Sequence, residues 1–124
     1  MVHDVMLRLS ALFWLIAAPV FAEMQLVMVE EPGCVWCARW NTEIGPIYPK
    51  TALGETAPLR RIDIHAPVPA ELDLKRGLSF TPTFILVDDG REIGRLEGYP
   101  GEDFFWGLME KMVAEARPGQ EDLG

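Results

Sequence analysis

The segment Pro32-Gly-Cys-Val-Trp-Cys37 decides the fold of this 124-residue chain. It holds both cysteines of the sequence and is separated by Glu31 alone from a short apolar run, Met24–Glu30. That run predicts a buried strand, and the Pro-Gly pair after it predicts a turn. Apolar residues then recur at helical spacing, so a helix is expected to begin at Cys34 and to be interrupted at Gly45-Pro46, because proline lacks the amide donor.

Two cysteines separated by two residues occur in zinc sites, in structural disulfides and in redox centres. Zinc needs four ligands, and His65 is the one histidine beyond the first residues of the chain, so no metal is expected. A structural disulfide is a weaker explanation, because so small a loop removes little entropy from the unfolded state. A redox pair explains the placement, since unpaired amides and the dipole at a helix N-terminus favour a thiolate. We expect Cys34 to be the nucleophile and Cys37, one turn further, to be the resolving cysteine, with their disulfide as the only redox group and no other cofactor.

The rest of the chain predicts an α/β fold. Strands are expected at Leu59–Ile64, Thr83–Val87 and Glu92–Glu97, and helices at Pro69–Arg76 and Glu102–Ala116. Asp89-Gly90 between the last two strands predicts a hairpin. Two strands that are joined through a helix pair in parallel, and two strands that are joined by a hairpin pair antiparallel. We therefore expect a four-stranded mixed sheet with helices on both faces.

The first 22 residues resemble a secretory signal peptide rather than part of the fold. An uncharged run from Leu9 to Phe21 is too short for a transmembrane helix and ends in Val20-Phe-Ala22 before Glu23. We expect cleavage after Ala22, which leaves a single domain, residues 23–124, in the periplasm. An uncleaved membrane anchor is the alternative.

Charge limits the partners of this domain. The chain has 11 Lys+Arg against 19 Asp+Glu, a formal net charge of −8. Nucleic acids and anionic lipid surfaces attract clusters of Lys and Arg, which the sequence lacks. We expect a protein partner and a monomer.

A second motif, Phe80-Thr-Pro-Thr-Phe84, lies directly before a predicted strand. Together with the cysteine pair it resembles the pattern of the thioredoxin family, from Met24 to about Ala114. The resemblance implies a thioredoxin-like fold in which Pro82 is a cis-proline packed beside the disulfide and the Thr81 backbone pairs with an incoming peptide. An ordinary trans proline at a strand start is the alternative. Gly33 and Trp36, at the rim of the pair, are expected to contact substrate as well.

The chain departs from ordinary thioredoxins at two places. Val35-Trp36 separates the cysteines in place of Gly-Pro, and Met28 stands six positions before Cys34, where thioredoxins carry a buried acid. Glu30 and Glu31 lie nearer the cysteines, but adjacent acids at a strand end are expected to be solvated. His65 is expected to lie too far away to act as a base at Cys34.

A narrower resemblance involves four stretches that most thioredoxins lack, residues 37–41, 43–51, 57–64 and 98–106. They are similar to the periplasmic thioredoxin-like proteins encoded in sulfur-oxidation (Sox) gene clusters. The resemblance implies a thiol reductant that reactivates a cysteine-bearing sulfur-carrier subunit and receives electrons from a membrane thiol transporter. The alternatives are an apocytochrome c thiol reductant, a general periplasmic thiol reductant, and a non-catalytic thioredoxin-like binding module.

Overall fold

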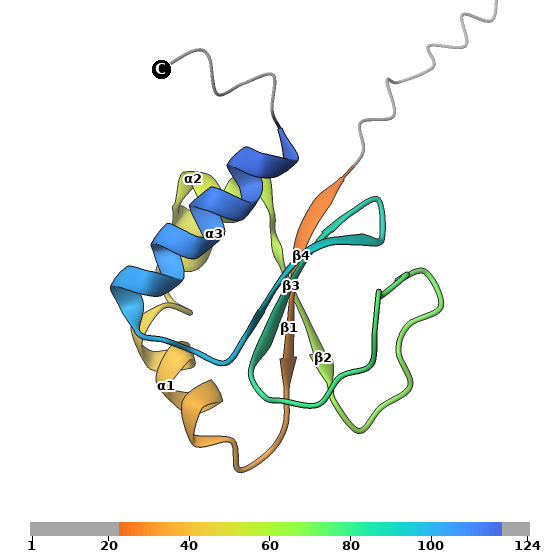
Figure 1. Ribbon diagram of the computed structural model, residues 1–124. Coiled ribbons are helices and arrows are strands. Elements are labelled where there is room, and N and C mark those ends of the chain that lie inside the picture. Colours follow the sequence, from red (N-terminus) through yellow and green to blue (C-terminus); the bar gives the residue numbers. More distant parts are fainter. Residues whose placement is uncertain (1–22, 118–124) are drawn as a thin grey trace, which may run out of the picture.

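The computed structural model describes residues 23–117 and contains one mixed sheet with the strand order β2-β1-β3-β4 (Figure 1). The elements follow in the order β1 (Met24–Glu30), α1 (Val35–Glu43), a 3₁₀ turn η1 (Tyr48–Lys50), α2 (Ala52–Thr56), β2 (Leu59–Asp63), β3 (Thr83–Asp88), β4 (Arg91–Glu97) and α3 (Glu102–Ala116). The expected signal peptide lies outside the described residues. Between residues 23 and 117, no helix is both long and apolar enough to cross a membrane.

The pairing of β1 brings three loops to one edge of the sheet. β1 pairs in parallel with β2, with Val29 opposite Ile62, and antiparallel with β3, with Val29 also opposite Thr83. The carboxyl ends of β1 and β2 and the start of β3 therefore lie side by side. This register places the cysteine segment, the segment after Asp63 and the segment before Thr83 next to one another.

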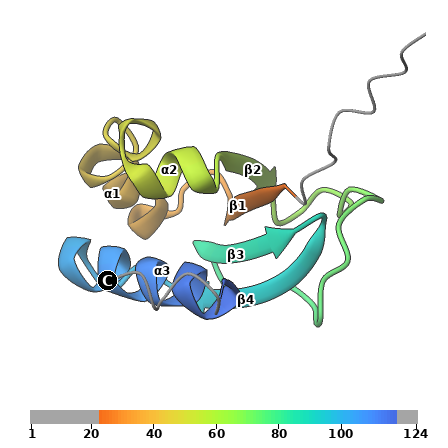
Figure 2. The ribbon, with the colours of Figure 1, turned by 90° about the horizontal axis from the view of Figure 1, so that it is seen from above.

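One face of the sheet is closed by aromatic side chains from the helices. Trp40 of α1 and Phe105 of α3 are fully buried with their ring centroids 5.8 Å apart, and each contacts Phe84 of β3. Tyr48 joins this cluster and donates a hydrogen bond from its hydroxyl to the Ala57 carbonyl at 2.6 Å. Seen from above, α1 and α2 lie toward the β1–β2 side of the sheet and α3 toward β4 (Figure 2).

Within residues 23–117, the opposite face is covered without a helix. The helix predicted at Pro69–Arg76 is wrong, because the backbone of this segment pairs with β4 instead. The Asp73 amide donates to the Gly90 carbonyl at 2.8 Å, and the Glu92 amide donates to the Asp73 carbonyl at 3.0 Å. Leu72 from this segment packs on an apolar layer contributed by β1 and β3, namely Val27, Val29, Ile85 and Val87. The prediction of helices on both faces is therefore corrected, whereas the four-stranded mixed sheet is confirmed.

The other predicted elements are confirmed with small shifts. β1 and α3 have the predicted bounds, and β2 ends one residue earlier, at Asp63. The hairpin turn has positive φ at Asp89 (53°) and Gly90 (83°), as a two-residue turn between right-twisted strands requires. α1 ends at Glu43, before Gly45-Pro46, and the short elements η1 and α2 that follow were not predicted.

Candidate active site

The two cysteines form a disulfide at the start of α1, and their two environments differ. Cys34 is the N-cap residue and is half-buried, whereas Cys37 lies in the first turn and is only 3% exposed. The Cys37 amide donates a hydrogen bond to Cys34 Sγ at 3.1 Å. A sulfur in this position faces the unpaired amides of the helix N-terminus, which stabilise a thiolate. The geometry therefore makes the Cys34 sulfur the accessible one and places a hydrogen-bond donor where a thiolate forms on reduction.

A tight turn delivers Cys34 to this position. The Cys34 amide donates to the Glu31 carbonyl at 3.3 Å, which closes a four-residue turn with Pro32 and Gly33 at its centre. Gly33 has φ +81°, a backbone conformation that the third residue of a type II turn requires and that side chains disfavour. Pro32 suits the second position of the same turn because its φ is fixed. The Pro-Gly sequence thus sets the direction in which the chain enters α1.

The Pro82 segment lies at the same edge of the sheet. The Thr81–Pro82 peptide bond is cis, and Pro82 and Thr83 are buried. Two hydrogen bonds hold this segment, from Thr83 Oγ1 to the Phe80 carbonyl at 2.7 Å and from the Gly98 amide to the Pro82 carbonyl at 2.7 Å. Within residues 23–117, neither the amide nor the carbonyl of Thr81 makes a backbone hydrogen bond.

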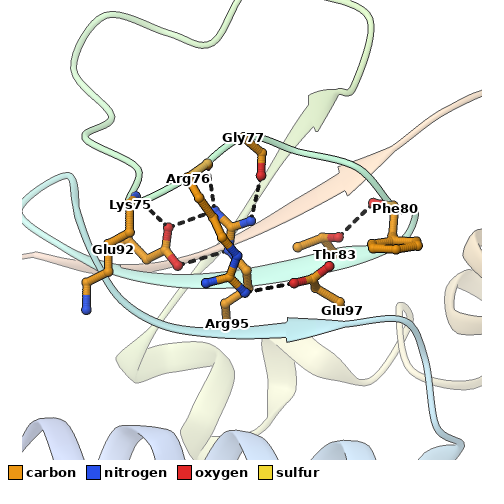
Figure 3. A network of polar contacts seen from close by, with 8 residues as sticks. All are labelled: Lys75, Arg76, Gly77, Phe80, Thr83, Glu92, Arg95 and Glu97. Carbon is orange, nitrogen blue, oxygen red and sulfur yellow. Dashed lines mark hydrogen bonds and ion pairs between the residues drawn. The ribbon is translucent and has the colours of Figure 1, made fainter.

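A buried ion pair supports the chain that leads to Pro82 (Figure 3). Glu92 and Arg95 of β4 pair at 2.8 Å, and their side chains are 2% and 4% exposed. The Arg95 guanidinium also donates to the carbonyls of Arg76 and Gly77, at 3.1 and 2.9 Å, and Glu92 accepts from the Lys75 amide at 3.0 Å. Burial opposes ionisation of Glu92, but the hydrogen bonds from Arg95 and Lys75 outweigh it and lower the pKa of this carboxyl group. The pair therefore supplies the hydrogen-bond partners that a helix would have found within its own backbone.

The acids near the cysteines are partly exposed, and each of them is paired. Glu31 Oε1 accepts from Thr81 Oγ1 at 2.8 Å, and Glu31 Oε2 lies 2.8 Å from His65 Nε2. The hydrogen bonds from Thr81 and His65 lower the pKa of Glu31. Glu30 pairs with Arg61 at 2.9 Å. The parallel register of β1 and β2 could have predicted the His65 contact, because residues that follow two paired parallel strands are neighbours.

The position that holds an acid in thioredoxins is apolar in this chain. Met28 is fully buried on the face of the sheet that carries Cys37. Its Sδ lies 3.6 Å from Arg61 Nη1, and the same guanidinium lies over the Trp40 ring at 5.7 Å from the centroid. The face behind Cys37 therefore carries a cation at its rim and no carboxylate at Met28.

The segments that carry the disulfide and the cis peptide also carry exposed apolar side chains. Val35 and Trp36, between the cysteines, are 74% and 51% exposed, and Phe80 before the cis peptide is 59% exposed. Arg39 lies over the Trp36 ring at 5.6 Å from the centroid. Trp40 is buried in the core, and Trp106 is partly buried and stacks on Tyr48. No group of three or more potential ligands within residues 23–117 is arranged to hold a metal ion.

Comparison with known proteins identifies related structures. The crystal structure of the reduced periplasmic thioredoxin SoxS from Paracoccus pantotrophus is 50% identical, covers 76% of this chain and 99% of its own, and superposes with a TM-score of 0.74. A thioredoxin-fold protein from Helicobacter pylori, 17% identical over 82% of this chain and 76% of its own, has a TM-score of 0.56. A Malassezia sympodialis thioredoxin, 14% identical over 74% of this chain and 76% of its own, has a TM-score of 0.51.

The last two structures establish the fold alone, whereas the first establishes the family. No protein-family model matches the chain, and no curated protein matches its sequence. The Cys34–Cys37 disulfide lies at the helix start that this fold uses for thiol-disulfide exchange. The chain therefore belongs to the family of the thioredoxin SoxS and is a thiol-disulfide oxidoreductase.

Proposed function

We propose that this protein is a periplasmic thiol reductant that reactivates a cysteine-bearing sulfur-carrier subunit during sulfur oxidation. Residues 1–22 act as a signal peptide and residues 23–124 as the exported domain. The relative at 50% identity is described as a periplasmic thioredoxin, which supports this location. The resemblance of residues 37–41, 43–51, 57–64 and 98–106 to proteins of sulfur-oxidation gene clusters supports the partner.

One observation carries the proposed chemistry: an accessible sulfur at the N-cap of α1 is paired with a buried one in the first turn. In the reduced protein, the Cys34 thiolate attacks one sulfur of the substrate disulfide and the other substrate sulfur leaves as a thiolate. Cys37 loses its proton to solvent and attacks Cys34, which releases the second substrate thiolate and forms the Cys34–Cys37 disulfide. The two electrons gained by the substrate are those lost by the two cysteines, and a membrane thiol transporter restores them.

The Pro82 segment docks the substrate in this mechanism. The amide and carbonyl of Thr81 are free of backbone partners within residues 23–117 and can pair with an extended peptide. Trp36 offers an exposed ring two residues after Cys34. Gly33 leaves open space directly before Cys34, since a Cβ at this position would meet no atom within 4 Å. These three residues are assigned to substrate binding.

A trapping experiment tests the function. Replacement of Cys37 by Ala blocks resolution, so the substrate remains bound to Cys34 as a mixed disulfide. In periplasm of sulfur-grown cells we expect this variant to capture a sulfur-carrier subunit through its cysteine, and Cys34→Ala, the matched control, to capture nothing. Capture of apocytochrome c or of many unrelated secreted proteins would assign the reductase to cytochrome maturation or to general thiol reduction.

A second measurement separates the enzyme from a non-catalytic binding module. Alkylation of the reduced protein with iodoacetamide at increasing pH reports the pKa of the Cys34 thiol. We expect a pKa well below the ordinary cysteine value of about 8.5. An ordinary pKa together with an empty trap would contradict the catalytic role.

A further inference from the structure

Glu31 connects the two halves of the site. Its main-chain carbonyl accepts the Cys34 amide at 3.3 Å, and its side-chain Oε1 accepts the Thr81 hydroxyl at 2.8 Å. Cys34 belongs to the segment between β1 and α1, whereas Thr81 belongs to the segment before β3 and lies 50 residues after Glu31. One residue thus contacts the nucleophile's segment through its backbone and the docking segment through its side chain.

The carboxylate of Glu31 also contacts His65. Its Oε2 lies 2.8 Å from His65 Nε2, and the His65 amide donates to Asp63 Oδ1 at 2.7 Å. The Glu31 side chain is 33% exposed, so these contacts form at the surface rather than in the core. Hydrogen bonds from Thr81 and His65 lower the pKa of Glu31, so the group is ionised at neutral pH and accepts both of them. Both carboxylate oxygens therefore have a hydrogen-bond partner, which favours the orientation of Glu31 toward Thr81.

Thr81 depends on this contact more than the residues after it do. Pro82 and Thr83 are buried and are held by hydrogen bonds to Gly98 and Phe80. Within residues 23–117, the hydrogen bond to Glu31 is the one that Thr81 makes. The main-chain groups of Thr81 that are assigned to the substrate thus have their position fixed from one side by the Pro82 ring and from the other by Glu31.

We propose that Glu31 is a positioning residue that holds the Thr81 backbone at the spacing from Cys34 at which a bound peptide disulfide can pair with Thr81 and reach Cys34 at the same time. This inference rests on the proposed function, because it assumes that the substrate chain docks on Thr81. Glu31 itself touches neither the substrate nor the reacting sulfurs. Loss of the Glu31 side chain should weaken the binding of substrates that contact both segments. It should leave unchanged the reduction of substrates that contact Cys34 alone.

Two disulfides of different size separate these cases. The first is the homodisulfide of a synthetic decapeptide with one central cysteine, which is long enough to pair with Thr81. The second is hydroxyethyl disulfide, which has no peptide backbone. For Glu31→Ala we expect the KM for the peptide to rise about tenfold, because Thr81 loses the charge-assisted hydrogen bond that holds its backbone in the position for docking. The kcat for the peptide and the rate with hydroxyethyl disulfide should change less than about twofold.

Matched variants distinguish positioning from charge and from stability. Glu30→Ala removes a carboxylate one residue away that pairs with Arg61 rather than Thr81, so it should leave the peptide KM unchanged. Glu31→Gln retains an oxygen acceptor and should preserve most of the effect of Glu31. Thr81→Val should raise the peptide KM as Glu31→Ala does, Thr81→Ser should restore it, and the double variant Glu31→Ala/Thr81→Val should be no worse than either single one.

The outcomes separate this inference from the function on which it rests. If the unmodified protein reduces neither disulfide, both the proposed reductase and the role of Glu31 fail. If it reduces both but Glu31→Ala and Glu30→Ala have the same effect, or if the Glu31 and Thr81 effects simply add, the reductase stands and the positioning role is wrong. A fall in the hydroxyethyl disulfide rate for Glu31→Ala would likewise overturn it, because that substrate does not reach Thr81.

Discussion

On the helical face of the sheet, aromatic rings from α1, β3 and α3 interlock, with Phe84 and Phe105 at a centroid distance of 5.0 Å. On the other face, a segment without helical structure lies over small apolar side chains and is tied down by a buried ion pair, Glu92–Arg95. The first face carries the cysteines and the second carries the chain that leads to Pro82. The site therefore lies where a face closed by packing meets a face closed by polar contacts, and substitutions on the two should act differently.

The largest expected effect is on the helical face. Phe105 is fully buried and contacts Trp40 and Phe84, so Phe105→Ala leaves a cavity that the surrounding rings cannot fill. We expect the free energy of unfolding to fall by about 4 kcal/mol, measured by urea denaturation. Phe104→Ala on the same helix is the control, because Phe104 is 69% exposed and should change stability little. Equal effects for the two would mean that this face is not closed by packing.

The corresponding destabilising substitution on the other face is Arg95→Met. It leaves the Glu92 carboxylate buried without its cation and removes the donors to the carbonyls of Arg76 and Gly77. We expect a loss of about 3 kcal/mol in the free energy of unfolding. Arg91→Met, at an exposed position of the same strand, is the control. A stable Arg95→Met variant would show that apolar contacts alone hold this segment.

Acid should weaken the second face through Glu92. The pKa of Glu92 is lowered in the folded protein, so its ionised form contributes stability at neutral pH. This contribution declines once the pH falls below the glutamate pKa of the unfolded chain, and it is absent below the lowered pKa. The dependence is at most about 1.4 kcal/mol per pH unit for one proton. Glu92→Gln should remove this part of the pH dependence, and an unchanged profile would contradict the assignment.

Two hydroxyl groups provide a matched pair across the sheet. Tyr48 donates to the Ala57 carbonyl on the helical face, and Thr83 donates to the Phe80 carbonyl beside the Pro82 segment. We expect Tyr48→Phe and Thr83→Val each to lower the free energy of unfolding by about 1 kcal/mol. Only Thr83→Val should also raise the KM for the decapeptide disulfide. A similar KM change in Tyr48→Phe would indicate that general loosening, rather than loss of local support, affects docking.

The smallest effect concerns an ion pair at the surface. Arg60 and Glu71 form a pair in which the Glu71 side chain is 62% exposed. We expect Arg60→Ala to change the free energy of unfolding by less than about 0.5 kcal/mol, and the small difference to disappear in 1 M salt. A larger loss would mean that exposed pairs, and not only the buried one, hold the segment between β2 and β3.

The sequence predicted the parts of the fold that depend on local signals. β1 is an apolar run, the hairpin has Asp-Gly at its turn, and α3 has one apolar face, so each is apparent from neighbouring residues. The cysteine pair and Thr81-Pro82 were found in the same way. Thr51 is a local signal for α2 as well, since it caps the helix by accepting a hydrogen bond from the Gly54 amide.

The segment at residues 69–76 could not be predicted in this way. Its apolar residues suit a helix, yet its backbone partners are Gly90, Glu92 and Arg95, which lie on or beside another strand. The contact of Glu31 with Thr81 has the same origin, because it joins residues 50 positions apart. Such contacts depend on the register between distant strands, which local sequence patterns do not determine.

The bridge between Asp73 and Arg91 also affects whether separate molecules of the protein associate through their sheets. β4 is an outer strand of the sheet, and an uncovered outer strand offers free amides and carbonyls to a strand of another molecule. The Asp73 backbone occupies part of that strand. The opposite outer strand, β2, is five residues long and carries Arg60, Arg61 and Asp63. Both outer strands thus disfavour strand-to-strand aggregation at high concentration, although no helix among the described residues covers the outer edge of either of them.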